Sequence, residues 1–205
     1  MIKISAFAAI LLAAPVSAQE KSFDFSGISN IEVRNGITVE LVQGDEFSIV
    51  GTAQSGDVSQ FRLQKYGDWL AVNRNTRWFI FPYARQDQLT LTVTLPNTRA
   101  LKAYGTASIT ATGFSGNRIR AEALEGGTVT LNDFDMDETS LYATENGRLT
   151  ISGTCDALDA EAIDSATINA GAFNCETAEV ETKTAGVISI SETTQIVEDL
   201  GETAQ

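Results

Sequence analysis

The feature that most constrains the fold is a repeat of about 20 residues in the second half of the chain. Each of five segments has two runs of alternating apolar residues, separated by a small or turn-forming stretch. Their central apolar residues are Ile109, Val129, Leu149, Ile168 and Ile188. These positions are separated by 20, 20, 19 and 20 residues. The fold must therefore place like residues at a nearly fixed interval.

Alternation with a period of two within each segment predicts strands, with one apolar face and one face rich in Thr, Ser, Glu and Asn. A second column keeps the same step and holds Ala103, Ala123, Ala143, Ala162 and Thr182. Turn-forming residues that tolerate positive φ separate the strands. They are Gly105, Gly126-Gly127, Asn146-Gly147, Asp164-Ser165 and Ala185-Gly186.

The repeat predicts an all-β chain folded as a parallel β-helix, which we expect to be right-handed, with coils of about 20 residues. At about 3.3 Å per extended residue, such a segment traces roughly 66 Å, enough for one closed circuit. One coil alone buries too little apolar surface to offset its conformational entropy, so stacked neighbours are required. An antiparallel sandwich is the alternative, because Asn146-Gly147 is also a hairpin signal.

Aromatic residues recur after the second strand of each segment. Phe114, Phe134 and Phe173 occupy this place, and Thr154 stands there in the intervening segment. We expect the three rings to stack at a corner of the coil, which explains them better than a cofactor site does.

The two cysteines provide a test of the coil hypothesis. Cys155 and Cys175 are 20 residues apart and occupy equivalent turn positions of adjacent coils. A stacking distance of about 4.8 Å lies within the Cα separation that a disulfide tolerates. The spacing therefore predicts one disulfide between coils, whereas a redox-catalytic role would need a Cys-x-x-Cys motif, which is absent.

The N-terminus predicts export. Lys3, the apolar run from Ala6 to Val16 and the small residues Ser17-Ala18 form a signal peptide over residues 1–18, with cleavage before Gln19. We expect residues 19–205 to form one domain, with less regular coils over 19–97, regular repeats over 98–193 and an acidic tail over 194–205. No later segment is long and apolar enough for a transmembrane helix.

Charge and composition limit the function. The formal net charge of −13 opposes binding to nucleic acid. Histidine is absent, which excludes Ser-His-Asp and Cys-His nucleophilic sites and imidazole metal sites. Carboxylate-pair catalysis is still compatible with the composition.

The N-terminal half is also β, with strands on both sides of Asn35-Gly36 and further strands at 47–50, 69–72 and 89–95. The run from Asn35 to Asp45, the stretch Val93–Pro96 and the Gly- and Ala-rich repeats resemble the head GIN domain family of adhesin-like exported bacterial proteins. The resemblance extends from about Phe23 to Glu192. It implies an exported β-helical protein with an adhesin-like role.

One segment stands apart as a candidate binding patch. It concentrates aromatic and arginine side chains, which are enriched where partners dock. The patch residues are Arg74, Arg77, Trp78, Phe79, Phe81, Tyr83 and Arg85. Pro82 opposes a regular central strand here. The alternative is that Trp78 and its neighbours cap the open end of the β-helix.

We expect the acidic residues to form neither a catalytic site nor a metal site. The segment Asp133–Asp137 has the oxygen ligands that calcium prefers but lacks the EF-hand spacing, so we expect a solvated acidic turn, with calcium binding as the alternative. Glu122, Glu145 and Glu161 are outward carboxylates without a nearby basic cluster. We expect no cofactor and no catalysis.

The sequence therefore predicts a noncatalytic, exported interaction module of adhesin-like type, periplasmic or at the cell surface, which binds a protein or a glycan. A β-helical carbohydrate-active enzyme and a structural envelope scaffold are the alternatives. A homo-oligomer through the edges of the end coils is a further possibility if the tail leaves Ile188 and Ile190 uncovered.

Overall fold

The computed structural model describes residues 18–75 and 88–199. These residues form fifteen strands and one short 3-10 helix, η1 (Val58–Gln60). The strands are β1 (Gln19–Ser22), β2 (Asn30–Val33), β3 (Thr38–Gln43), β4 (Ser48–Ala53), β5 (Phe61–Tyr66), β6 (Trp69–Arg74), β7 (Leu89–Leu95), β8 (Ala100–Tyr104), β9 (Ser108–Thr112), β10 (Ser115–Leu124), β11 (Thr128–Ala143), β12 (Arg148–Ile163), β13 (Thr167–Lys183), β14 (Val187–Ile190) and β15 (Gln195–Asp199). The predicted all-β class is confirmed.

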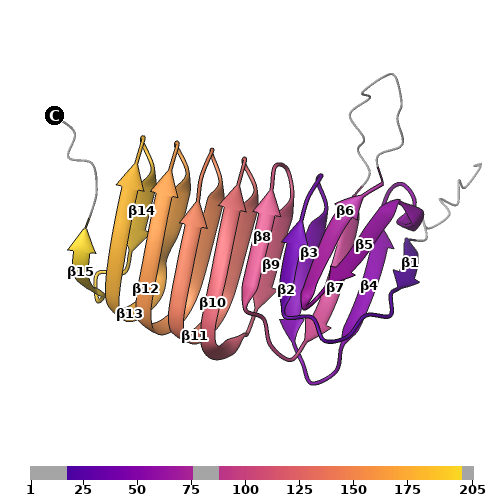
Figure 1. The fold of residues 1–205 in the computed structure, drawn as a ribbon, viewed down its shortest axis with the longest axis horizontal. Coiled ribbons are helices and arrows are strands. Elements are labelled where there is room, and N and C mark those ends of the chain that lie inside the picture. The colour runs from indigo at the N-terminus through magenta and orange to yellow at the C-terminus, as the bar shows by residue number, and fades with distance from the viewer. Residues whose placement is uncertain (1–17, 76–87, 200–205) are drawn as a thin grey trace, which may run out of the picture.

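The repeats stack as parallel coils (Figure 1). Val129 pairs with Ile109 on one side and with Leu149 on the other. Leu149 pairs with Ile168, which pairs with Ile188, and all of these pairings are parallel. The β-helix prediction is confirmed, and the antiparallel sandwich is wrong for this part of the chain.

Along each strand, every second side chain points into the coil and fills its inside. In β11, Val129, Leu131 and Phe134 point inward and are at most 1 % exposed, whereas Asp133 and Asp135 are exposed. The inward residues of successive coils join one continuous hydrophobic core. A single coil has no core of its own, so neighbouring coils stabilise each other.

The one spacing of 19 residues has a local cause. The register between β11 and β12 shifts between Leu131 and Phe134, and that between β12 and β13 shifts between Thr150 and Ser152. The coil of β12 is therefore one residue shorter than its neighbours at this corner. Asp133, on the longer strand, takes a φ of 56°, as expected for an extra residue in a bulge.

The turns between the two long sides of each coil use pairs of residues with positive φ, such as Glu145 at 51° and Asn146 at 65°. A glycine follows three of these pairs: Gly127, Gly147 and Gly186. The sequence predicts these glycines as positions of positive φ, but the structure requires them for another reason. A Cβ on any of them would lie 2.0–2.2 Å from a carbonyl oxygen of the preceding coil. These glycines are needed for space between coils rather than for positive φ.

The phenylalanine ladder is present but interrupted. The ring centroids of Phe114 and Phe134 are 5.6 Å apart. Gly153, rather than Thr154, pairs with Phe134 and then with Phe173. All three rings are at most 1 % exposed. Thr154 faces outward, because the register shift moves it past the aromatic column.

The N-terminal half adds two rungs that stack out of sequence order. The first, β2 and β3, pairs with β8 and β9 on one side. On its other side it pairs with β6 and β7, which come later in the chain. The turn between β2 and β3 uses Asn35 and Gly36, with φ of 60° and 67°. The regions predicted as less regular coils are thus two parallel rungs with inserted strands.

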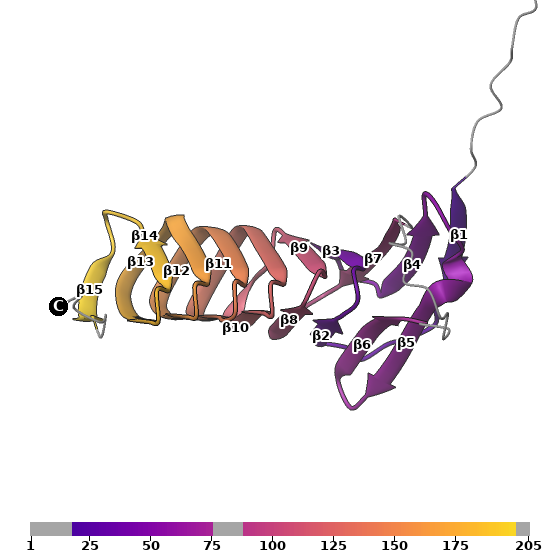
Figure 2. The same cartoon turned by 90° about the horizontal axis from the view of Figure 1, so that it is seen from above.

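Antiparallel strands cover the N-terminal end (Figure 2). β4 pairs antiparallel with β7, β5 with β6, and β1 with β4. Phe23 and Phe61 pack edge to face beneath them, with ring centroids 6.0 Å apart. At the other end, β14 and β15 both pair with β13, and Ile188 and Ile190 pack against the core. Within residues 18–75 and 88–199, no helix is long and apolar enough to cross a membrane.

Candidate functional site

The predicted binding patch begins at the end of β6. The Nη2 atom of Arg74 donates a hydrogen bond to the carbonyl oxygen of Gly36 at 3.3 Å. The other predicted residues lie outside the described part of the chain: Arg77, Trp78, Phe79, Phe81, Tyr83 and Arg85. They belong to the connection from β6 to β7, which replaces the two-residue turn of the other rungs. This patch stays a prediction.

The ends of that connection are attached to the antiparallel cover. The amide of Asn75 donates to the carbonyl oxygen of Gln60 at 2.7 Å. The amide of Gln88 donates to Oγ of Ser55 at 3.0 Å. The connection therefore starts and ends on a hydrogen-bonded base at the N-terminal end of the solenoid.

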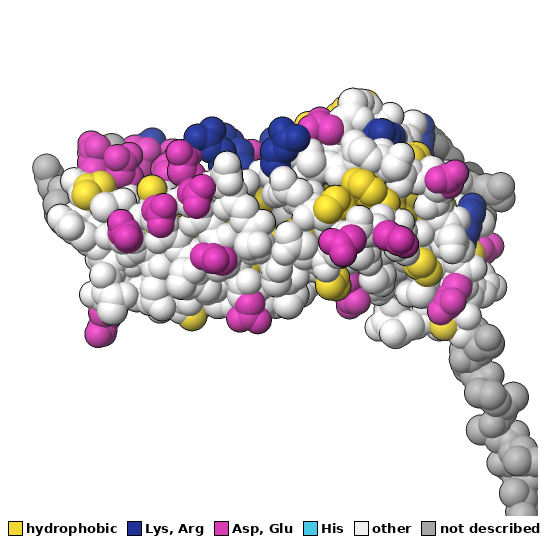
Figure 3. All heavy atoms as spheres, turned by 90° about the horizontal axis from the view of Figure 1, so that it is seen from below, with side chains coloured by type: hydrophobic (Ala, Val, Ile, Leu, Met, Phe, Trp, Pro, Cys, Tyr) yellow, Lys and Arg dark blue, Asp and Glu magenta, His cyan; other side chains and the backbone are white. Residues whose placement is uncertain are grey.

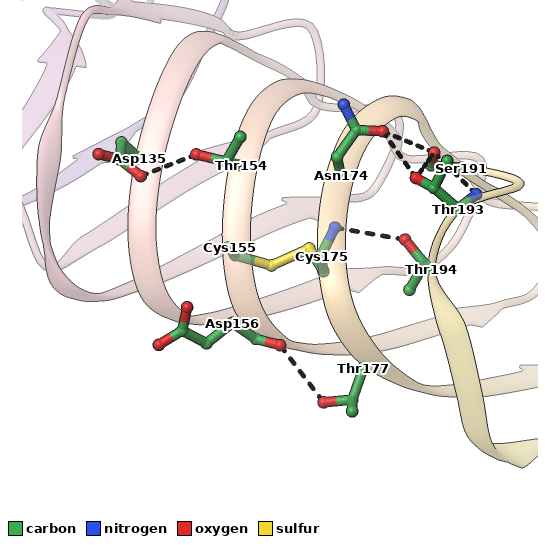
Figure 4. Close-up of a disulfide and its surroundings, with 10 residues drawn as sticks. All are labelled: Asp135, Thr154, Cys155, Asp156, Asn174, Cys175, Thr177, Ser191, Thr193 and Thr194. Atoms are coloured by element: carbon green, nitrogen blue, oxygen red, sulfur yellow. Dashed lines mark hydrogen bonds between the residues drawn. A yellow bond between two sulfur atoms is a disulfide. The ribbon is translucent and has the colours of Figure 1, made fainter.

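The predicted disulfide is confirmed (Figure 4). Cys155 and Cys175 pair in register on β12 and β13, with a Cα–Cα distance of 4.4 Å. The amide of Cys175 also donates to Oγ1 of Thr194 at 3.3 Å. The disulfide and this bond join three successive levels of the solenoid near its C-terminal end.

The acidic segment Asp133–Asp137 is part of a bent strand rather than a turn. Phe134 and Met136 alternate into the core and leave the carboxylates outside. Oδ1 of Asp135 accepts a hydrogen bond from Oγ1 of Thr154 at 2.7 Å. Among the described residues, no group of three or more Cys, Asp or Glu side chains is arranged to hold a metal ion.

The outward side of the sheet formed by β5, β6, β2, β8, β10, β11, β12, β13 and β15 carries most of the ion pairs, and we call it the charged face. Glu122 is only 5 % exposed there. Its two carboxylate oxygens contact Nζ of Lys102 at 3.0 Å and Nε of Arg120 at 2.6 Å. Buried carboxylates require such partners. In Figure 3, acidic side chains gather at the C-terminal end of the molecule, with basic side chains beside them.

The N-terminal end of the charged face holds an aromatic cluster of Tyr66, Trp69 and Tyr104, with Arg34 and Lys102. The rings of Tyr66 and Trp69 are nearly parallel, with centroids 6.4 Å apart. The guanidinium of Arg34 lies 3.6 Å from the centroid of Tyr104, and Nζ of Lys102 lies 5.3 Å from that of Trp69. These are cation–π distances.

The two tyrosines of this cluster respond to their surroundings. Burial, and secondarily the charge of Glu32, raises the pKa of both Tyr66 and Tyr104. Both hydroxyls therefore stay protonated at neutral pH and can donate hydrogen bonds. Tyr66 is also 51 % exposed. The cluster thus presents an aromatic ring and hydroxyl donors to solvent.

A groove of about 480 Å³ crosses the middle and C-terminal part of the charged face. Small side chains form its floor, and longer ones form its two ends. The floor includes Ser140 on β11, Ala157 on β12 and Thr177 on β13. Arg118 and Arg120 lie on β10 at one end, whereas Asp159 and Glu179 lie two residues beyond Ala157 and Thr177 on β12 and β13. The groove can therefore contact a ligand that carries both signs of charge.

Two ionic features set the electrostatics of the groove. Arg118 forms an ion pair with Glu138 on the adjacent rung. Burial, and then the charge of Glu161, raises the pKa of Asp159, whereas Arg120 opposes that shift. Asp159 and Glu179 are neighbours in register, so a cation between them would relieve repulsion between like charges.

The groove was missed by sequence reasoning, although a signal was present. Arg120, Ser140, Asp159 and Glu179 stand at equivalent places of successive repeats. The outward columns of the repeats thus place long side chains on both sides of short ones, just as the inward columns predict the core.

The three carboxylates considered for catalysis do not converge. Glu122 is paired with cations, and Glu145 lies in a turn with a φ of 51°. Glu161 contacts Nζ of Lys183 at 3.2 Å. Tyr142 stands between Glu122 and Glu161 in the column of paired residues. Glu122 and Glu161 are therefore each paired with local cations, and Glu145 lies apart from both in its turn.

The fold defines the chain as a β-solenoid. Its candidate sites, the aromatic cluster and the groove, are open surfaces on the charged face. Residues 27–198 match the family model described as "Putative auto-transporter adhesin, head GIN domain", and the chain belongs to this family. The predicted resemblance is confirmed. Among curated proteins, none matches the chain.

Solved structures share the fold at low sequence identity. A "putative adhesin" from Bacteroides fragilis has a TM-score of 0.67 at 10 % identity, covering 90 % of this chain and 96 % of its own. One from Parabacteroides merdae has a TM-score of 0.71 at 17 % identity, covering 89 % and 75 %. A "putative lipid binding protein" from Parabacteroides distasonis has a TM-score of 0.65 at 15 % identity, covering 91 % and 95 %. These likenesses concern the fold alone.

Proposed function

We propose that this chain is a noncatalytic, exported, adhesin-like module that binds a protein or glycan surface at the cell envelope. The aromatic cluster is the observation that carries this proposal. It places Tyr66, 51 % exposed, and Trp69 on a rigid sheet beside Arg34 and Lys102. Aromatic and arginine side chains are the residues that most often dominate binding interfaces.

The groove extends the same face. Its charged ends and small floor residues suit a polar partner that lies across several rungs. The predicted patch from Arg74 to Arg85 would add further aromatic and basic contacts from the connection between β6 and β7. Membership of the adhesin family supports binding rather than catalysis.

Export is supported by the disulfide, because such bonds persist in oxidising compartments. We expect the protein recovered from the cell envelope or the medium to begin at Gln19 and to contain no free thiol. Intact-mass measurement with and without reductant tests both expectations. Retention of residues 1–18 together with two free thiols would contradict export.

Binding is tested on a glycan array and on immobilised envelope proteins. We expect saturable binding that Tyr66→Ala weakens by about tenfold or more, with Trp78→Ala reporting on the predicted patch. Val42→Ser is the matched control, since Val42 is 48 % exposed on the opposite side of the coil. Equal affinity for Tyr66→Ala and the control would remove the aromatic cluster from the proposal.

The absence of catalysis has its own test. Candidate polysaccharides are incubated with the purified protein, and the products are followed by reducing-sugar release and by absorbance for unsaturated sugars. We expect no turnover. Release of product by the purified protein would contradict a binding module.

A homo-oligomer through the edges of the end coils is also part of the proposal. Within the described residues, β14 and β15 pair only with β13, so each leaves one edge without a neighbouring strand.

A further inference from the structure

The two ends of the charged-face sheet are edge strands of opposite character. The sheet runs from β5 through β6, β2, β8, β10, β11, β12 and β13 to β15. Among the described strands, β5 pairs only with β6, and β15 pairs only with β13. Each therefore has one free row of backbone amides and carbonyls, which is a template for another strand.

The free edge at β15 is apolar and acidic. Ile196 and Val197 are 49 % and 53 % exposed, two of the few large apolar side chains so exposed in the described chain. Glu198 is exposed next to Glu179, its partner in register on β13. The pairing shifts between Ala178 and Glu179, so the strand is locally irregular.

The free edge at β5 is basic. Arg62, Gln64 and Lys65 are exposed along the strand. Nζ of Lys65 contacts the carbonyl oxygen of Ser26 at 2.5 Å, so it is partly committed within the molecule. Arg62, which pairs with Asn73 on β6, lies on the outward side of the sheet, as Glu198 does at the opposite end.

We infer that the β15 edge of one molecule pairs with the β5 edge of a second copy, in a head-to-tail assembly. This inference rests on the proposed oligomerisation and specifies which edges meet. β15 runs parallel to β13, and β5 runs antiparallel to β6, so the new pair is antiparallel. Arg62 then lies within reach of Glu198, and Leu63 within reach of Ile196.

Charge selects this arrangement over the symmetric ones. A tail-to-tail contact would bring Glu198 and Glu179 of both copies together, and a head-to-head contact would bring Arg62 and Lys65 together. Like charges across strands destabilise pairing, whereas opposite charges stabilise it. A heterologous contact leaves a free edge at each end, so assembly continues beyond a dimer. The outward faces remain accessible, because strand pairing uses only the edges.

Sedimentation of the purified exported protein over a range of concentrations tests the inference. At low salt we expect a series of species that grows with concentration and continues past the dimer. At about 0.5 M salt the series should shrink, because exposed charges are screened. A single monomeric species at all concentrations would overturn the inference. The edge charges would then serve to prevent strand pairing between molecules.

Charge reversal identifies the edges. Arg62→Glu gives two acidic ends and Glu198→Arg gives two basic ends, so neither variant should assemble alone. An equimolar mixture should assemble, because each acidic end then meets a basic end; recovery in the mixture also shows that both variants are folded. Arg148→Glu makes the same change as Arg62→Glu, but on an exposed residue of β12.

Each remaining outcome overturns the inference. They are assembly of either variant alone to the wild-type extent, a mixture that stays monomeric, and loss of assembly in Arg148→Glu. Monomeric Arg62→Glu is also applied to the glycan array. If it binds like wild type, the binding function stands independently of assembly; if no form binds, the proposed binding fails while assembly is still measured on its own.

Discussion

At the scale of single residues, this fold depends on places where a side chain has no room. Gly153 lies between Phe134 and Phe173, and its φ is 124°. A Cβ there would lie 1.9 Å from the carbonyl oxygen of Phe134. Backbone atoms cannot move aside as a flexible side chain can, so the coils would have to separate locally.

We therefore expect Gly153→Ala to lower the free energy of unfolding by about 2 kcal/mol or more, from strain and disrupted coil stacking. Chemical denaturation of the purified protein measures this change. Gly171→Ala is the matched control, since the nearest atom to its Cβ would be a side-chain oxygen of Asn169 at 3.4 Å. Equal losses for the two variants would refute the steric account.

A second residue-scale prediction concerns Asp159. Burial raises its pKa, with Glu161 adding to the shift and Arg120 opposing it. A raised pKa in the folded state means that folding favours the protonated acid. The unfavourable contribution is thus present at neutral pH and is lost as the pH falls through the folded-state pKa.

Asp159→Asn should therefore stabilise the protein at pH 7, by less than about 1 kcal/mol because the site is substantially exposed, and the gain should vanish near pH 3. Thermal unfolding at both pH values provides the measurement, with Glu40→Gln on β3 as the control. A gain that is the same at pH 3 and pH 7 would contradict a titration effect.

At the scale of elements, the disulfide joins β12 and β13, which have the longest run of paired residues among the described strands. Cys155 and Cys175 close a loop of about 20 residues, for which the chain-entropy relation gives about 3 kcal/mol. We expect the double variant Cys155→Ala and Cys175→Ala to lose roughly that stability in denaturant, and reduced wild type to match it. No difference between oxidised and reduced wild type would show that the bond adds nothing to stability.

The elements also show why part of the fold could be predicted. In the regular coils each strand pairs with the strand about 20 residues away, so a pattern such as Ile109, Val129 and Leu149 specifies the neighbours directly. The N-terminal rungs break this relation. β2 pairs with β6 and β8, because β4, β5 and their connections are inserted between the rungs. Nothing in the sequence periodicity encodes which rung lies outermost.

The candidate site was less predictable than the fold. The disulfide followed from spacing alone, because Cys155 and Cys175 belong to adjacent regular coils. The aromatic cluster depends on a contact between Trp69 on β6 and Lys102 on β8, two strands that lie on either side of β2 in the permuted order. A local reading of either segment gives no reason to join them.

At the scale of the whole molecule, a solenoid behaves as a line of units, each stabilised by its two neighbours. Central strands such as β11 and β12 have a parallel neighbour on both sides. The N-terminal rungs have the antiparallel cover of β4 and β5. β14 and β15 have a described neighbour on one side only, so the C-terminal rung should open most easily.

Amide hydrogen exchange on the monomeric protein tests this gradient. We expect the slowest exchange in β11 and β12, intermediate rates in β6 and β7, and the fastest in β14 and β15. Reduction of Cys155–Cys175 should speed exchange mainly in β13 and the rung beyond it, because Cys175 anchors β13 to β12. In head-to-tail assemblies the β15 amides should gain protection, since their free edge is then paired. Uniform exchange along the solenoid would contradict the one-dimensional picture, because it requires all rungs to open together.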